Sequence, residues 1–153
     1  ILLTFRPLVV LSYPFLLLFP LLHRFMNEMF FHAYDFNQPI DAWDTSNVKN
    51  MESLFEKAVA FNQPIGSWNV SAVVCMNATF SSAKSFNQPI GNWDTSSVKW
   101  MIDMFTNAKS FDQPIGNWNV DNVSNFTDMF EKAKMSVPEE WGAQNNKMSE
   151  VRK

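Results

Sequence analysis

The sequence predicts an α/β fold: a right-handed solenoid in which each 25-residue turn carries one very short strand and one short helix. Three observations lead to this prediction. A 25-residue unit repeats without gaps, its second half has a helical spacing of apolar residues, and a proline excludes a helix from its first half. A fixed period of this size indicates structural units that stack on one another.

Four complete units cover residues 36–60, 61–85, 86–110 and 111–135. Each unit opens on a phenylalanine and contains a tryptophan seven residues later; the tryptophans are Trp43, Trp68, Trp93 and Trp118. One turn cannot bury such side chains alone, whereas stacked turns bury them against their equivalents. We therefore expect the tryptophan column to be buried and structural, each aromatic residue contributing about 1.5–3 kcal/mol.

The second half of each unit predicts an amphipathic helix. Val48, Met51, Phe55 and Ala58 are spaced by three, four and three residues, which places them on one helical stripe. Two residues before the valine stands Ser46, or its equivalents Ser71, Ser96 and Asp121, as a candidate N-cap. The predicted helices cover residues 47–57, 72–82, 97–107 and 122–132.

The first half of each unit predicts the strand. Pro39 and its equivalents Pro64, Pro89 and Pro114 exclude a helix and remove one donor from any ladder. The strand should therefore begin at or just after the proline and contain three to five residues.

Two sets of polar columns have structural interpretations. Asn37, Asn62, Asn87 and Asp112, with the glutamines that follow them, should hydrogen-bond from turn to turn. Asp44 and Asp94 alternate with Asn69 and Asn119, which avoids stacking like charges one strand spacing apart. The Asp44/Asp94 column is the best place to look for a metal or catalytic site, but carboxylates before a turn usually accept backbone N–H groups.

The string FNQPIGNWDTSSV, followed by a segment rich in methionine and phenylalanine, resembles the BspA-like leucine-rich-repeat family of bacterial surface proteins. The resemblance covers residues 24–135. It implies a leucine-rich-repeat-like solenoid on a secreted or cell-surface protein, with roles in binding or adhesion and no catalytic residues.

The chain divides into three regions. Residues 1–22 are apolar and carry no charge from Pro7 to Leu22, so they are a remnant of a secretion signal, a degenerate capping turn or a translated non-coding stretch. Residues 23–135 form the array of one half and four full repeats. Residues 136–153 are expected to be a C-terminal cap, ending at Trp141, and a polar tail.

Composition and motifs predict no enzyme and no cofactor. The net charge is −3 without a basic patch, so no nucleic-acid partner is expected. His23 and His32 have no ligand cluster around them, and the single Cys75 has no histidine partner in any motif. Catalytic, cofactor and metal sites are therefore all predicted to be absent.

The sequence thus favours a non-enzymatic interaction module of a secreted or cell-surface protein that binds a protein or glycan. A membrane partner is expected only if residues 1–22 are a signal or an anchor. Two alternatives remain: a structural spacer in a larger surface protein, and an accessory segment of an enzyme. Trp100 stands in a variable column (Asn50, Cys75, Trp100, Asn125) and is the one candidate contact residue.

Overall fold

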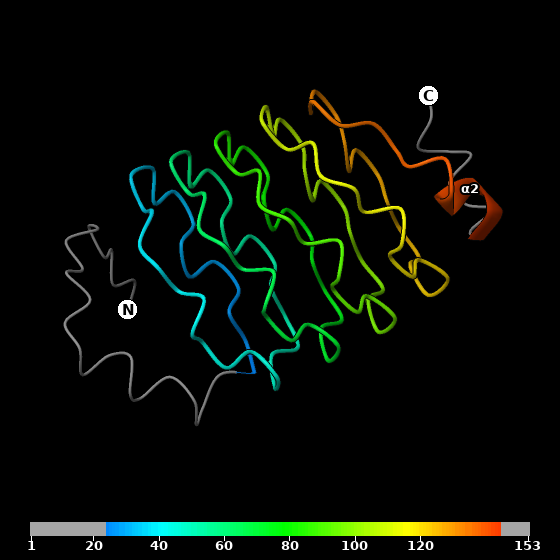
Figure 1. Ribbon diagram of the computed structural model, residues 1–153, viewed down its shortest axis with the longest axis horizontal. Coiled ribbons are helices and arrows are strands. Elements are labelled where there is room, and N and C mark those ends of the chain that lie inside the picture. The colour runs from blue at the N-terminus through cyan, green and yellow to red at the C-terminus, as the bar shows by residue number, and fades with distance from the viewer. Residues whose placement is uncertain (1–23, 145–153) are drawn as a thin grey trace.

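The computed structural model describes residues 24–144, which form a stack of coils that follow one another along the long axis of the molecule (Figure 1). Within this range the only helix is α2 (Trp141–Gln144), and no residue belongs to an extended strand. The coils are instead joined by isolated parallel bridges that pair residues 25 apart. The period of the sequence is therefore also the period of the structure.

Consecutive tight turns build the second half of each coil. In the coil of Met51, the N–H of Leu54 donates to the Met51 carbonyl (3.2 Å), and the N–H of Ala58 donates to the Phe55 carbonyl (2.9 Å). The third residue of each turn has a positive φ, 52° at Ser53 and 60° at Lys57. A bond from residue i+3 to residue i with positive φ at i+2 is the geometry of a type II turn.

The remaining N–H groups of this segment bond to the next coil. Met51, Ser53, Phe55 and Lys57 donate to the carbonyls of Cys75, Asn77, Thr79 and Ser81 at 2.8–2.9 Å. Alternate residues therefore bond within their own coil and between coils. This pattern satisfies the backbone without forming a helix or a strand.

The prediction of helices at 47–57, 72–82, 97–107 and 122–132 is wrong. Met51, Leu54, Phe55 and Ala58 are all fully buried, but each pair bounds a four-residue turn whose two middle residues point away from the core. Two such turns in succession place apolar residues at i, i+3, i+4 and i+7, which is also the spacing of a helical stripe. Ser46 consequently caps no helix. Its own N–H donates to the Asp44 side chain at 3.0 Å.

The predicted strand after the proline is also wrong. That segment makes a tight turn in which the Trp68 N–H donates to the Ile65 carbonyl at 3.1 Å, and the other three units repeat it. The parallel pairing lies in the other half of the coil, one residue per coil, at Phe25, Asn50, Cys75, Trp100 and Asn125. The α/β solenoid with a helix and a strand in every turn is therefore replaced by a stack of turn-built coils.

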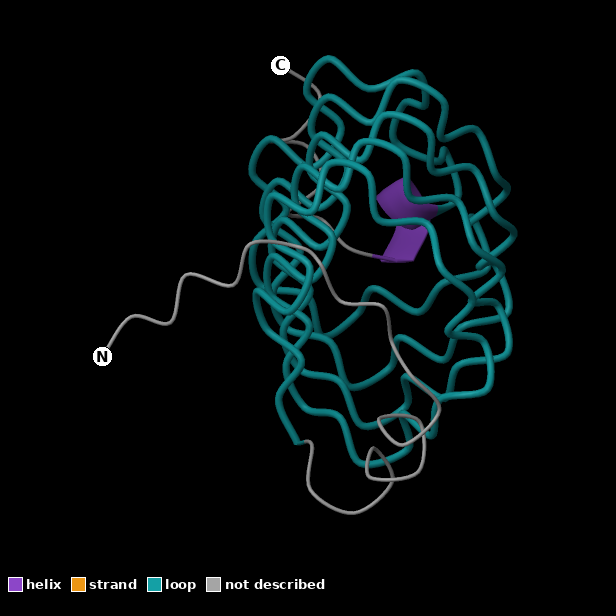
Figure 2. Ribbon diagram, turned by 90° about the vertical axis from the view of Figure 1, so that its left-hand side faces the viewer, coloured by secondary structure: helices purple, strands orange, loops and turns teal. Residues whose placement is uncertain are grey.

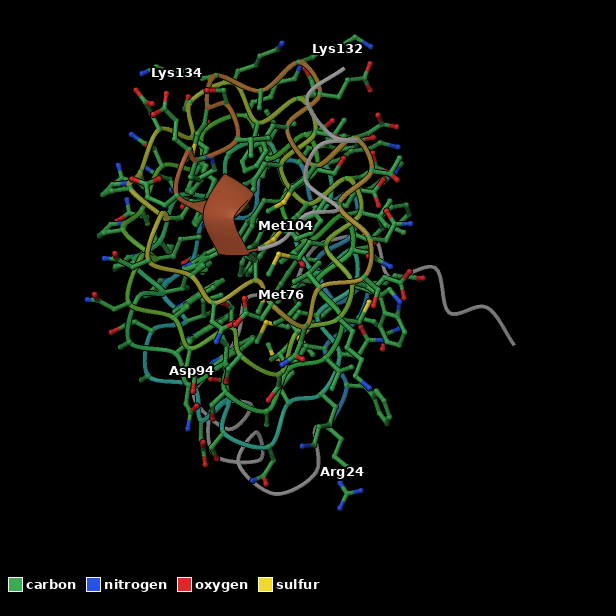
Figure 3. The ribbon with its side chains drawn as sticks, turned by 90° about the vertical axis from the view of Figure 1, so that its right-hand side faces the viewer. Arg24, Met76, Asp94, Met104, Lys132 and Lys134 are labelled. Carbon is green, nitrogen blue, oxygen red and sulfur yellow. The ribbon has the colours of Figure 1, made fainter. Side chains whose placement is uncertain are left out.

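Aromatic columns fill the core. Phe55 stacks on Phe80 with 5.7 Å between ring centroids, and Phe80 on Phe105 with 5.6 Å. Figure 3 shows Met76 and Met104 within the outline of the coils, whereas Asp94, Lys132 and Lys134 lie at the rim. Because each coil repeats the same apolar positions, the core is one continuous cluster from Met26 to Trp141.

The tryptophan column is buried, as predicted, and it also carries a hydrogen-bond ladder. Trp43, Trp68, Trp93 and Trp118 are at most 7% exposed. The indole Nε1 groups of the last three donate to the carbonyls of Ile40, Ile65 and Ile90 at 3.0–3.2 Å. Each tryptophan therefore fills the core and also ties its coil to the preceding one.

The predicted polar contacts between coils are confirmed. The Asn62 side-chain oxygen accepts from the Asn87 N–H (2.9 Å) and from Nε2 of Gln88 (3.0 Å). Asn37 and Asn87 make the same contacts with the coils that follow them. One asparagine oxygen per coil thus positions the chain that enters the following unit.

The C-terminal end of the stack is closed by Trp141. Its ring is fully buried and stacks on Trp118 with 6.1 Å between centroids. Figure 2, which looks along the stack, shows α2 projected within the outline of the coils. The prediction for residues 1–22 lies outside the described residues, as does most of the predicted polar tail. No helix in the described range is long and apolar enough to cross a membrane.

Candidate binding surface

One side chain per coil projects from the bridge ladder formed by Phe25, Asn50, Cys75, Trp100 and Asn125; we call this surface the ladder face. The backbone on both sides of each rung is bonded to neighbouring coils. For Trp100, its carbonyl accepts from the Met76 N–H (2.9 Å), and Lys99 before it donates to the Val74 carbonyl (2.9 Å). The rungs are therefore held at a regular spacing by the backbone.

Trp100 projects outward from this ladder. Its ring is 42% exposed, whereas the other described tryptophans are at most 7% exposed. The next residue, Met101, is fully buried, so the outward direction of Trp100 follows from the alternation of side chains in extended backbone. The sequence-predicted contact residue therefore lies on the surface, near the middle of the stack.

Phe25 is a second exposed aromatic residue on the same ladder, and the sequence analysis did not identify it. It is 61% exposed and pairs with Asn50 through the first bridge. Its position 25 residues before Asn50 was the available signal. Because the repeat was counted only from residue 36 when the variable column was examined, this rung was left out.

Asn50 and Asn125 turn their amide nitrogens toward solvent. The Oδ1 of Asn50 accepts from the Glu52 N–H, and the Oδ1 of Asn125 accepts from the Thr127 N–H, both at 2.8 Å. In the described part of the chain neither Nδ2 group donates to the protein. These two rungs therefore offer oriented hydrogen-bond donors.

Cys75 lies between these groups but has no activated thiol. It is half-buried, and burial raises the pKa of its thiol above the usual value. A raised pKa favours the neutral thiol, which is a poor nucleophile. Cys75 thus contributes a small, weakly polar surface to the ladder face.

The Asp44/Asp94 column has the structural role that its position suggested. Hydrogen bonds from Ser46 and Ser96 hold the pKa of Asp44 and Asp94 below the usual value. Asn69 occupies the coil between them and makes the equivalent bond to the Ser71 N–H at 3.1 Å. The structure therefore places the two carboxylates in separate, locally satisfied turns.

His32 lies at the N-terminal end of the stack, away from both aspartates in sequence. Its Nε2 is 3.0 Å from Nζ of Lys57, and its Nδ1 is 3.1 Å from the Tyr34 hydroxyl. His23 lies outside the described residues. Between residues 24 and 144, no three His, Cys, Asp or Glu side chains gather in a way that could hold a metal ion.

Two open grooves occur near the C-terminal end. The larger, ≈ 1230 Å³, lies between residues 128–135 and the segment that leads to α2, and the smaller, ≈ 380 Å³, is bordered by Asp112, Ile115 and Glu140. Lys134, which lines both, is paired with Asp112 at 2.8 Å. Neither groove brings together a nucleophile and a base.

Comparison with known proteins identifies the family. No curated protein matches the chain, and no solved structure matches it. A family model does match, over residues 24–141, and its description is "Mycoplasma protein of unknown function, DUF285". The resemblance to the BspA-like leucine-rich-repeat family is thereby corrected, because the matching model is that of a different family and the coils lack the helix and strand of a leucine-rich repeat. The chain belongs to the DUF285 family.

Proposed function

We propose that this chain is a non-enzymatic interaction module that binds a protein or a glycan on its ladder face, with Trp100 as a principal contact. The observation that carries the proposal is the exposure of Trp100 in a chain that buries the other described tryptophans. A large aromatic ring left in water contributes little to folding, whereas a partner that covers it gains its full hydrophobic burial.

The proposal requires no catalytic residue, cofactor or nucleic acid. It places the protein outside the cell or on the cell surface, and this location rests on the uncharged run from Pro7 to Leu22 in the sequence. The regular backbone of the stack supports binding in a second way. A rigid scaffold fixes its contact residues before the partner arrives, which lowers the entropic cost of association.

A purely structural spacer is the alternative function. It is favoured by the unbroken aromatic columns, which join every coil to the next through the core. For a spacer, the side chain at position 100 is of no consequence as long as the coils stack.

The test compares the full 153-residue chain with its Trp100→Ala variant. Both are immobilised and exposed to purified extracellular proteins and to a glycan array. We expect at least one analyte whose binding weakens about 10-fold or more in the variant. The matched control is Tyr34→Ala, which removes another exposed aromatic ring that lies off the ladder face. Equal binding by all three chains, or binding by none, would favour the spacer.

A further inference from the structure

The two exposed aromatic residues of the ladder face lie on one line parallel to the stack. Phe25 and Trp100 are joined through the rungs of Asn50 and Cys75, so they stand three coils apart. At the ~4.8 Å spacing of paired strands, this separation is roughly 14 Å. A ligand that contacts both rings must therefore be elongated and lie along the axis of the stack.

The rungs beside these rings are polar and uncharged. Asn50 follows Phe25 and Asn125 follows Trp100, and each holds its Oδ1 in a backbone hydrogen bond that leaves Nδ2 directed outward. The ladder therefore alternates apolar ring faces with hydrogen-bond donors that are already oriented. Lys99 and Glu52 border it with opposite charges, so the face as a whole has no strong charge preference.

This composition fits a sugar chain better than a protein interface. The centre of a protein interface is a dry apolar cluster in which aromatic residues are surrounded by other apolar side chains. Trp100 instead has Asn125 and Cys75 as its neighbours on the ladder, and Ser124 and Lys99 are exposed beside it. A neutral sugar offers apolar ring faces for stacking and hydroxyl groups for the asparagine donors.

We infer that the ladder face binds a neutral, linear oligosaccharide that lies along the stack, with sugar rings on Phe25 and Trp100 and hydroxyl groups bonded to Asn50 and Asn125. This inference rests on the proposed function and narrows its partner to one class. In the described residues, the two grooves lie at the C-terminal end, and the ladder face is an open surface. Such a surface accepts the interior of a long chain as readily as its end.

The test uses isothermal titration calorimetry of the full chain with cellopentaose, chitopentaose and maltopentaose, and with the matching disaccharides. We expect saturable binding of at least one pentasaccharide, and binding of its disaccharide that is weaker by about 10-fold or more, because a disaccharide cannot span both rings. Trp100→Ala and Phe25→Ala should each weaken the pentasaccharide about 10-fold or more, as the loss of one aromatic stacking contact does elsewhere.

Tyr34→Ala is the matched control and should leave the affinity unchanged, and thermal unfolding of each variant shows that the fold is retained. Trp100→Tyr should recover part of the affinity, since it restores a stacking surface. Absence of binding to all three pentasaccharides overturns the inference, as does binding that Trp100→Ala and Phe25→Ala leave unchanged. If a purified protein binds in a manner that depends on Trp100 while the sugars do not bind, the proposed function stands and the glycan inference fails.

Discussion

The indole Nε1 of Trp93 donates a 3.2 Å hydrogen bond to the carbonyl oxygen of Ile65 in the preceding coil. Trp141 stacks at the end of the same column, yet its buried Nε1 has no hydrogen-bond partner in the described residues. Trp141 follows Trp118 by 23 residues, whereas the other spacings in the column are 25. The shortened last unit therefore preserves the ring stacking and loses the hydrogen bond.

This difference predicts unequal effects of the same substitution. Trp93→Phe leaves the buried Ile65 carbonyl without a partner and should cost about 1–3 kcal/mol in addition to the loss of ring volume. Trp141→Phe removes a donor that is already unpaired, so only the volume term remains. Chemical denaturation of both variants measures the two losses, and a cost at Trp141 equal to that at Trp93 would contradict the prediction.

The glycines of the repeat should differ in their tolerance of a methyl group. A Cβ at Gly66 would lie 2.5 Å from the carbonyl oxygen of Pro89, which is backbone of the next coil and cannot move without separating the stack. At Gly116 the same Cβ would meet only the carboxylate of Glu140, an exposed side chain that can turn away. We expect Gly66→Ala to destabilise the fold by about 1–3 kcal/mol and Gly116→Ala by much less. Thermal unfolding of the pair tests this order.

Asp44 and Asp94 should make the fold sensitive to acid. Hydrogen bonds from Ser46 and Ser96 lower the pKa of these carboxyl groups in the folded state. A folded-state pKa below the unfolded value contributes stability above the unfolded value of about 3.9, and this contribution is lost as the pH falls through the folded value. In the Asp44→Asn, Asp94→Asn double variant the denaturation midpoint should fall less between pH 5 and pH 2. The natural Asn69, which makes the same turn, indicates that the variant will fold.

The sequence allowed the repeat unit, the buried tryptophans and the asparagine contacts to be predicted, because identical columns must stack on identical columns. It did not allow helices to be distinguished from turns. Met51, Leu54, Phe55 and Ala58 fit both structures, and the positive φ values that separate them occur at residues such as Ser53 and Lys57 rather than at glycine. Without a glycine to mark the turn, residue spacing favours a helix.

The candidate surface was predictable only in part, for a related reason. Trp100 was identified because its column varies while the others are constant. The outward direction of the column follows from the bridge ladder, which lies where the apolar spacing predicted a helix. With the ladder misplaced, Phe25 and the amide groups of Asn50 and Asn125 could not be recognised as part of the same line.

The positive φ values lead to a final prediction, that glycine will stabilise a position where it is ordinarily harmful. Ala78 has φ = 50° and is half-buried at the third position of a turn, so its Cβ is crowded by its own backbone. Ala78→Gly removes that crowding and should raise the free energy of unfolding by up to about 1 kcal/mol, net of the added freedom of the unfolded chain. Ala83 is the matched control, because it is fully buried and has no positive φ. Ala83→Gly loses a packed methyl group and gains only unfolded-state freedom, so it should destabilise the protein by about 1 kcal/mol or more. Equilibrium urea denaturation of the two variants decides the matter, since helical backbone at residues 72–82 would make both substitutions destabilising.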